Sequence, residues 1–283
     1  MVRREFFKMA AALAGLFSGG RKVTATEAHA WTLTSIQQQF DLEDVRKWVD
    51  PQAVTVTGPD PDIPAHWVGY LSPDHAVRLR HMPAELALIE PILPRTARIL
   101  REVTRDVFVI RLAPRNGERR FARVFNCIDP IDSKSKGELY SFLSYSPSPL
   151  VMVEEKNRIF LERAPEALSN LYRTIFDGIT DVGGDGLRPL HLMETVASAA
   201  QAYGEADWYD SFVAKTNPAL VYETIVNGAG ITGLIDLNDT SVAKATPIAI
   251  WTDAEEPKLE FEDFWEFNDM LLSIVIGATE DSR

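Results

Sequence analysis

Cysteine is nearly absent from this chain, which has Cys127 alone among 283 residues. A single cysteine can form neither an internal disulfide nor a cysteine-built zinc site, so both are excluded. Because Cys127 lies beside a predicted strand and has no obvious partner, we expect it to be buried like an apolar side chain.

Basic residues are also few for a chain of this size. The 29 lysines and arginines are outnumbered by 41 acids, and the net charge is −12. Proteins that bind nucleic acid present a basic surface to the phosphates, so nucleic acid is excluded as the default partner. The apolar fraction of 46% and the charged fraction of 25% are ordinary for a globular protein and argue against a disordered chain.

Familiar catalytic and metal-binding motifs are missing. The sequence has no Gly-x-Ser-x-Gly elbow, no His-Glu-x-x-His pair and no Walker phosphate loop. His66, His75 and His81 are near one another, but no two have the spacing of three or four residues that places two ligands on one helix face. From these residues we therefore expect no catalytic residue, no metal site and no cofactor.

No apolar run is long enough to cross a bilayer as a helix. The nearest candidate, residues 9–17, follows Arg3, Arg4 and Lys8 and precedes the small-x-small cleavage site of residues 28–30. A charged segment, a short apolar segment and a cleavage site, in this order, are typical of an export signal.

Residues 2–8 resemble the twin-arginine export signal, although Val2 stands where serine or threonine is usual. The resemblance implies that residues 1–30 are a signal peptide removed before Trp31. The mature protein would then be periplasmic, with no integral membrane segment. The alternative is an amphipathic first helix that begins with two arginines, in a cytoplasmic protein.

The charge changes sign along the rest of the chain. Residues 78–123 contain eleven arginines and five acids, whereas residues 124–283 contain eleven basic residues and 27 acids. We interpret the arginines as solvated or paired with acids of the same fold, the alternative being a phosphate-binding patch. The change predicts two parts, an N-terminal α+β region of unknown type at residues 31–160 and a second domain at residues 161–279.

Apolar periodicity and turn residues predict a mixture of helices and strands. Helices are expected at 84–105 (interrupted by two prolines), 165–176, 191–203 and 262–276. Strands are expected at 107–112, 119–125, 140–145, 221–226, 232–237 and 248–251.

Residues 228–233 match the Gly-x-Gly-x-x-Gly pattern of dinucleotide-binding proteins. Such a site needs its last glycine in the first turn of a helix, where main-chain amides hold the pyrophosphate. Here Gly233 is followed by a short alternating run that ends in turn formers. The pattern is therefore interpreted as a β-hairpin.

The order of motifs in the second half resembles the SUKH superfamily, the Smi/Knr-like domains. That family has a helix rich in Leu and Pro, a glycine-containing loop with an apolar-Pro-Leu stretch, an acidic Asp-Leu strand, a Trp strand and a C-terminal Phe-x-x-Phe helix. The glycines after the first helix are displaced from the family's usual place, and residues 31–160 are not covered. The matching positions are Pro165, Leu168, Tyr172, Gly183, Gly184, Pro189, Leu190, Gly228, Gly230, Asp236, Leu237, Trp251, Phe261 and Phe264.

The resemblance implies an α+β fold, with an antiparallel sheet flanked by helices and preceded by a smaller mixed α/β N-terminal region. It also implies a domain that catalyses nothing, so we expect a protein that is not an enzyme. Many bacterial members of the family are immunity proteins. We therefore expect this protein to bind and neutralise a cognate toxin, such as a secretion-system effector used in competition between bacteria. Its partner would be a lipase, a cell-wall hydrolase or a nuclease. The candidate partner-binding residues are Trp208, Tyr209, Asp236, Asp239, Trp251, Asp253, Glu255 and Glu256.

Two alternatives remain open for the function. The first is an exported enzyme or cofactor-binding periplasmic protein, because twin-arginine export often accompanies a folded protein that carries a cofactor. The second is a cytoplasmic regulatory scaffold in which the two arginines are accidental. For each candidate partner-binding residue, the alternative to partner binding is a role in core packing or in solubility.

Overall fold

The computed structural model describes residues 56–115, 118–128, 139–147, 153–181, 184–199, 208–226, 231–238, 247–251 and 264–276. The expected signal peptide at residues 1–30 lies outside these ranges.

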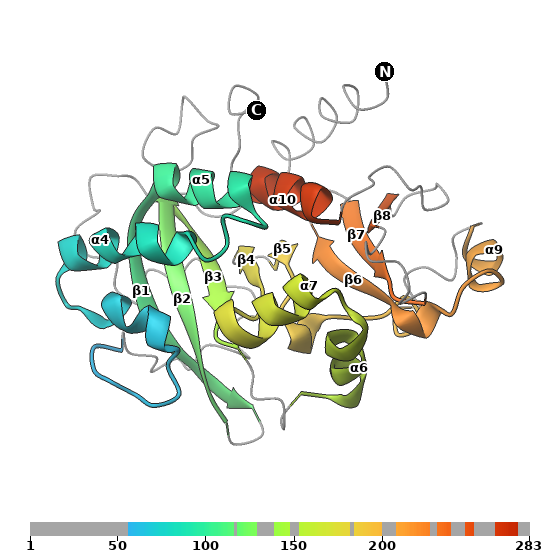
Figure 1. Ribbon diagram of the computed structural model, residues 1–283, viewed down its shortest axis with the longest axis horizontal. Coiled ribbons are helices and arrows are strands. Elements are labelled where there is room, and N and C mark those ends of the chain that lie inside the picture. Colours follow the sequence, from blue (N-terminus) through green and yellow to red (C-terminus); the bar gives the residue numbers. More distant parts are fainter. Residues whose placement is uncertain are drawn as a thin grey trace.

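One antiparallel sheet of eight strands runs through the described residues, with the strands in sequence order from one edge to the other. Helices flank this sheet, which confirms the predicted α+β class (Figure 1). The strands are β1 (Thr104–Arg115), β2 (Glu118–Ile128), β3 (Leu139–Tyr145), β4 (Ile179–Asp181), β5 (Gly186–Leu187), β6 (Val221–Val226), β7 (Ile231–Asp236) and β8 (Pro247–Trp251).

The helices fall into two sets along the chain. The set before the sheet comprises η2 (Ala65–Leu71), α4 (His75–Leu86) and α5 (Pro94–Val103). The later set comprises α6 (Glu155–Arg163), α7 (Glu166–Asn170), its π-helical continuation η4 (Leu171–Ile175), η5 (Leu190–Leu192), α9 (Tyr209–Val213), η6 (Pro218–Leu220) and α10 (Phe264–Val275).

The sheet is narrow at its centre. Strands β1 and β2 have 12 and 11 residues, whereas β4 and β5 have 3 and 2. Figure 1 shows these two short strands between the long strands β1–β3 and the hairpin of β6 and β7. Short strands provide few main-chain hydrogen bonds, so the two sides of the sheet depend on the elements packed across its centre.

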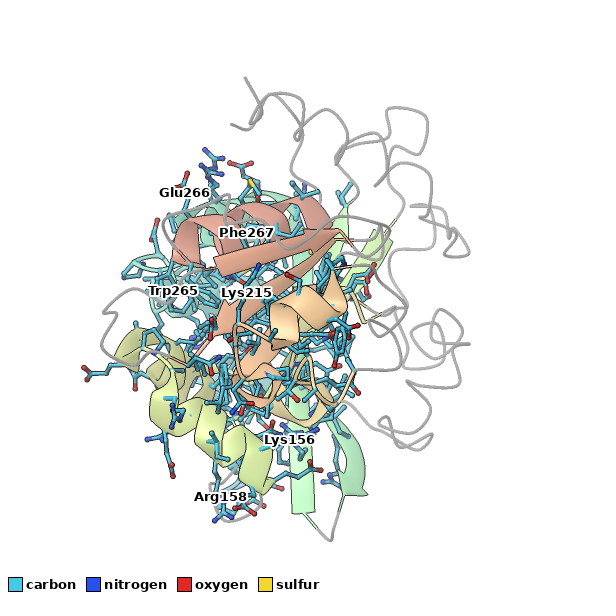
Figure 2. All side chains as sticks on the ribbon, turned by 90° about the vertical axis from the view of Figure 1, so that its right-hand side faces the viewer. Lys156, Arg158, Lys215, Trp265, Glu266 and Phe267 are labelled. Atoms are coloured by element: carbon cyan, nitrogen blue, oxygen red, sulfur yellow. The ribbon has the colours of Figure 1, made fainter. Side chains whose placement is uncertain are left out.

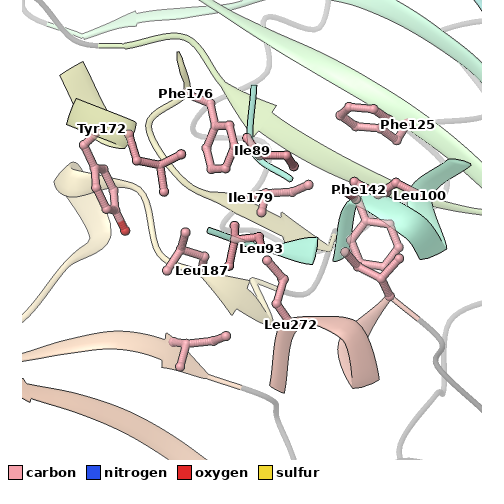
Figure 3. Close-up of a cluster of buried hydrophobic side chains, with 14 of the residues drawn as sticks. Ile89, Leu93, Leu100, Phe125, Phe142, Tyr172, Phe176, Ile179, Leu187 and Leu272 are labelled. Atoms are coloured by element: carbon pink, nitrogen blue, oxygen red, sulfur yellow. The ribbon is translucent and has the colours of Figure 1, made fainter. Parts of the chain in front are cut away.

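One hydrophobic core covers a face of the sheet from β1 to β7. Phe125, Phe142, Ile179 and Leu187 supply it from four successive strands, and Leu272 of α10 packs over them (Figure 3). Both the core and the sheet continue across residues 160 and 161, where the charge pattern predicts a domain boundary. In the described residues, the two predicted parts therefore share one core.

Helix α10 contacts the sheet through Phe267. A Cβ atom added to Gly233 of β7 would lie 2.5 Å from the Phe267 ring and 2.5 Å from the Ile225 side chain. Only glycine allows the ring to approach the strand this closely. This packing explains the last glycine of the Gly-x-Gly-x-x-Gly pattern, which lies within a strand of an antiparallel hairpin, as expected.

Helix α10 also caps α5 through Asp269, which is buried. Its two carboxylate oxygens accept hydrogen bonds from the amides of Arg95 and Thr96, at 2.9 and 2.8 Å. The residue before α5, Leu93, offers no side-chain cap. The carboxylate therefore satisfies two amides that the helix itself leaves without partners. Figure 1 shows α5 and α10 end to end above the strands.

The predicted helix at 191–203 is wrong in its described part, residues 191–199. The chain makes a single 3-10 turn at Leu190–Leu192, and Thr195 then forms an isolated bridge with Tyr222 of β6. The amide of Thr195 donates to the Ser198 hydroxyl at 2.8 Å, and the amide of Ser198 donates to the Thr195 hydroxyl at 3.1 Å. Such local side-chain bonds compete with helical hydrogen bonds.

Replacing Gly233 by alanine tests the contact between α10 and the sheet. We expect Gly233→Ala to lower the free energy of unfolding by about 1–3 kcal/mol, because the added methyl group overpacks against the Phe267 ring. Urea denaturation of purified protein measures the change. Gly58→Ala is the matched control, because a Cβ at Gly58 meets nothing within 4 Å; equal stability of the two variants would contradict the packing role.

Replacing Asp269 by asparagine tests the cap on α5. The asparagine side chain has a single oxygen, so it can accept a hydrogen bond from only one of the two main-chain amides in the same geometry. We therefore expect the free energy of unfolding to fall by about 1–2 kcal/mol. Thermal unfolding followed by circular dichroism provides the measurement. Glu266→Gln, at an exposed position of the same helix, removes the same charge and should change stability far less.

Candidate functional site

The predicted partner-binding residues are only partly described. Side-chain positions are given for Trp208, Tyr209 and Asp236. Trp251 is placed by its main chain, at the end of β8. The remaining four, which are Asp239, Asp253, Glu255 and Glu256, lie outside the described residues.

Trp208 is buried beneath α9, with 5% of its surface exposed. It belongs to a small cluster with Val221 and Leu234 of the sheet, and its ring lies 5.7 Å from that of Phe212 in an edge-to-face contact. Burial leaves little of the indole for a partner to touch. In this conformation Trp208 supports α9, and the half-buried Tyr209 beside it is the more accessible aromatic side chain.

Asp236 organises the loop that follows β7. Its Oδ1 atom accepts hydrogen bonds from the main-chain amide and the side-chain amide of Asn238, at 2.8 and 2.6 Å. Asn238 in turn donates to the hydroxyl of Thr216 and accepts from the amide of Asn217. This network ties the segment after α9 to the end of β7, so Asp236 lies at the same end of the hairpin as Trp208 and Tyr209.

Trp251 lies at the opposite end of the same strands. It pairs with Ile231, whereas the start of β8, Pro247, pairs with Ile235 next to Asp236. At 3.2–3.4 Å per residue, the length of β8 separates these two ends by about 15 Å. The described candidates therefore form two groups, one around α9 and one at the end of β8, rather than a single patch.

Figure 2 looks at the molecule from the α9 end. Helix α9, followed by Lys215, lies between α10 with Glu266 and α6 with Lys156. Its charged residues include the exposed Asp210. At this end of the molecule, the Asp236 network holds the segment that directly follows α9.

A buried polar centre lies between β2, β3, β4 and η5, and sequence reasoning missed it. Asp177, which is fully buried, accepts a hydrogen bond from the Arg120 guanidinium at 2.6 Å and another from the amide of Leu190 at 2.6 Å. The same guanidinium lies 2.9 Å from Nδ1 of His191. One buried ion pair therefore joins three segments that are far apart in the sequence.

Tyr145 completes the polar centre, which we define as Arg120, Tyr145, Asp177, Thr180 and His191. Its ring lies 5.7 Å from that of His191, and its hydroxyl lies 3.4 Å from the hydroxyl of Thr180. Burial raises the pKa of Tyr145 above its ordinary value, so its hydroxyl keeps its proton at neutral pH.

Among the groups near this centre, Asp185 has the pKa that is shifted most toward neutral pH. Burial, and then the charge of Asp181, raise its pKa to about 7, while the nearby Arg188 acts in the opposite direction. The two aspartates share the turn between β4 and β5, where the amide of Asp185 donates to Asp181 Oδ1 at 2.9 Å. A carboxyl group with this pKa can exchange protons near neutral pH.

A second buried ion pair lies on the helical face of the sheet. Arg123 pairs with Glu85 of α4, and its guanidinium lies 4.4 Å from the centre of the Trp67 ring. Tyr70 donates its hydroxyl proton to Glu85 at 3.2 Å. Burial first, and then the charge of Glu85, raise the pKa of Tyr70. Because both charged partners are about 2% exposed, this pair fastens α4 and η2 to β2.

The sequence carried a signal for both ion pairs. Arg120 directly precedes Phe121, and Arg123 lies within the otherwise apolar run from Phe121 to Phe125. A charged residue inside a buried strand needs a partner of opposite charge. Nothing in the sequence, however, showed that Glu85 and Asp177 are those partners.

Cys127 is fully buried, as the sequence predicts. Burial raises the pKa of its thiol to about 12, so the thiol stays protonated at neutral pH and is a poor nucleophile. Within the described ranges, no group of three or more His, Cys, Asp or Glu side chains is arranged to hold a metal ion. In the same part of the chain, no helix has the length and apolar character needed to cross a membrane.

Replacing Asp185 by asparagine tests the burial of its carboxyl group. Because folding raises the pKa of Asp185 from its ordinary value of 3.8 to about 7, the folded protein holds a proton that the unfolded chain has released. The free energy of unfolding therefore falls as the pH rises through this window. At about pH 8, the free energy of unfolding of Asp185→Asn should exceed that of the wild type by about 1–2 kcal/mol, after allowance for the partial exposure of Asp185. At about pH 4 the two should differ little.

Urea denaturation at the two pH values provides the measurement for Asp185. Asp210→Asn, at an exposed position of α9, removes one negative charge without uncovering a buried carboxyl group. The burial of Asp185 would be contradicted if its variant changed stability equally at both pH values, or if Asp210→Asn showed the same pH dependence.

Comparison with known proteins identifies no relative. No family model matches the chain, and no curated protein or solved structure matches it either.

Proposed function

We propose that this protein is an immunity protein that binds a cognate bacterial toxin and blocks it without catalysing a reaction. The observation that carries the proposal is the distribution of charge along the chain, in which an arginine-rich stretch is followed by an acidic second half. Four arginines of the basic stretch are engaged in ion pairs of the fold, with Asp106, Glu90, Asp177 and Glu85 as their partners. These four charges are balanced internally and add no net positive charge for an acidic ligand.

The second half of the chain keeps a large acid surplus. A dense part of it is residues 252–263, between β8 and α10 in the sequence, which contain six acids and one lysine. An acidic surface attracts a basic protein and speeds the encounter between them. Toxins that act on phosphates or membranes tend to be basic, so the charge fits a toxin as the partner. The resemblance to the SUKH superfamily supports the same assignment.

The proposed location follows from the export signal. If residues 1–30 direct export, the toxin acts in the periplasm, which favours a lipase or a cell-wall hydrolase over a nuclease. Sequencing the N-terminus of protein isolated from whole cells tests this part. A chain that starts at Trp31 supports export, whereas an intact Met1 supports the cytoplasmic alternative.

Binding to the product of the adjacent toxin gene is the test of the function. We expect a stable complex in size-exclusion chromatography and survival of cells that produce both proteins. The absence of a complex, together with no protection of intoxicated cells, would contradict the proposal.

Charge variants give this test a matched control. In the triple variant Asp253→Asn, Glu255→Gln, Glu256→Gln, we expect the dissociation constant of the complex to rise about tenfold, mainly through slower association. The control removes three exposed acids around α6 with Glu154→Gln, Glu155→Gln and Glu162→Gln. It should change the dissociation constant less than about twofold.

A second candidate function, an exported enzyme or cofactor-binding protein, is favoured by one observation. Perturbed titratable groups cluster at active sites, and Asp185 lies near the polar centre with a pKa of about 7. Metal analysis and ultraviolet–visible spectra of protein purified from its host distinguish the two candidates. A stoichiometric metal or chromophore would favour the second.

A further inference from the structure

The short helix η5 is fastened to the sheet through the buried ion pair of the polar centre. The amide of Leu190 donates to Oδ1 of Asp177 at 2.6 Å, and the Arg120 guanidinium donates to Oδ2 of the same carboxylate at 2.6 Å. Nη1 of this guanidinium also lies 2.9 Å from Nδ1 of His191, the next residue of η5. Two successive residues of η5 are therefore held by one ion pair.

The hydrogen bond between Arg120 and His191 determines the protonation state of the imidazole. A guanidinium has five donor hydrogens and no acceptor, so Nδ1 of His191 must accept. A ring nitrogen accepts a hydrogen bond only when it carries no proton. In this arrangement the imidazole is therefore neutral, and its single proton lies on Nε2.

A proton added to Nδ1 of His191 removes this hydrogen bond. The lone pair that accepts from Arg120 is then occupied, and two cations would lie 2.9 Å apart. Charges of the same sign repel strongly at this distance, above all where water is scarce. His191 is half-buried, so its ring can turn away from the guanidinium toward water, while Arg120 keeps Asp177 as its partner.

The acids around His191 already have partners of their own. The titratable and charged side chains that the structure describes on the elements around the polar centre are Arg120, Tyr145, Asp177, Asp181, Arg188 and Glu223. Glu223 pairs with Arg188 at 3.0 Å, and Asp181 accepts from the amide of Asp185 at 2.9 Å. Stabilising a protonated His191 would take these acids away from such partners.

The neighbours of His191 on α6 and β3 are uncharged at neutral pH. Asn157 of α6 donates its side-chain amide to the carbonyl of Leu190 at 2.6 Å. Tyr145 of β3 presents its ring to His191 edge to face, and burial raises the pKa of its hydroxyl. These contacts position η5 without supplying a charge that would favour the imidazolium.

Asp185 titrates in a similar range of pH but acts in the opposite direction. Burial raises its pKa to about 7, so its contribution to the free energy of unfolding is largest at low pH. The contribution of His191 is present above the pH at which an imidazole titrates in an unfolded chain, about 6.5, and is lost below it. The two effects therefore differ in sign as well as in position.

We propose that His191 is a pH-sensitive latch, by which we mean that its contact with Arg120 holds η5 against β2 only while the imidazole is neutral. When the imidazole gains a proton, the contact opens and residues 190–193 loosen. The latch couples acidification to the packing of the chain between β5 and β6. It goes beyond the proposed function and does not depend on a toxin partner.

Heteronuclear NMR of the histidine ring nitrogens tests the protonation states in the wild-type protein. At about pH 7.5, His191 should carry a proton on Nε2 and none on Nδ1, and by about pH 4.5 both nitrogens should be protonated. The spectrum of His191→Asn, which lacks these signals, assigns them. A proton on Nδ1 at the higher pH, or a ring that is still neutral at the lower pH, would overturn the proposal.

Hydrogen–deuterium exchange of the wild-type protein measures the release of η5. Protection factors, which are corrected for the intrinsic effect of pH on exchange, should fall about tenfold at residues 190–193 between about pH 7.5 and about pH 4.5. In β2 they should change less than about twofold. Unchanged protection at 190–193, or an equal loss in β2, would refute the latch.

Two variants separate the proton from the packing of the side chain. His191→Asn places an oxygen where Nδ1 accepts and cannot titrate in this range, so its protection at 190–193 should change less than about twofold on acidification. His75→Asn, at an exposed position of α4, is the matched control and should keep the tenfold loss of about the wild-type size. A tenfold loss of about the same size in His191→Asn would contradict the proposal. If His191→Asn folds poorly, the exchange data of the wild-type protein still decide.

Discussion

The arrangement of this fold depends most on the two hydrogen bonds that the Asp269 carboxylate accepts. It accepts two hydrogen bonds from the start of α5, which is the helix that leads into β1. Two residues earlier on α10, Phe267 fills the space above Gly233 in β7. One helix therefore connects the element that begins the sheet with the hairpin on its other side, across the narrow centre formed by β4 and β5.

The buried ion pairs have a related role. Arg123 and Glu85 fasten α4 to β2, while Arg120 and Asp177 fasten the chain between η4 and β4 to the same strand. A buried charge is costly unless a partner neutralises it. These pairs therefore favour the packing of helices and strands that brings the opposite charges together, because any other packing would leave a charge buried without its partner. They also remove the charges of Arg120 and Arg123 from the surface.

Local patterns in the sequence predicted much of the sheet, and for a physical reason. Alternating apolar residues mark β1, β2, β3, β6 and β7, because each of these strands is buried on at least one face. The C-terminal helix and the hairpin around residues 228–233 were predicted for the same reason. The helix expected at 191–203 failed where Thr195 and Ser198 bond locally and with β6.

Other features depend on residues far apart in the chain. The cap on α5 comes from Asp269, which is more than 170 residues away in the sequence. No local sequence pattern predicts it. The strands β4 and β5 are too short to show a period. For the candidate site, the sequence indicated the aromatic and acidic residue types. It did not show that Trp208 is buried, or that Asp236 and Trp251 lie at opposite ends of the same strands.

The central claim is that the acidic second half of this protein captures a basic toxin. The most direct test is the association rate constant of the complex with the adjacent-gene toxin, measured by stopped flow across a range of ionic strength. Electrostatic capture predicts that association slows at least about tenfold between low and high salt, while dissociation changes little. An association rate that does not depend on salt would contradict the account.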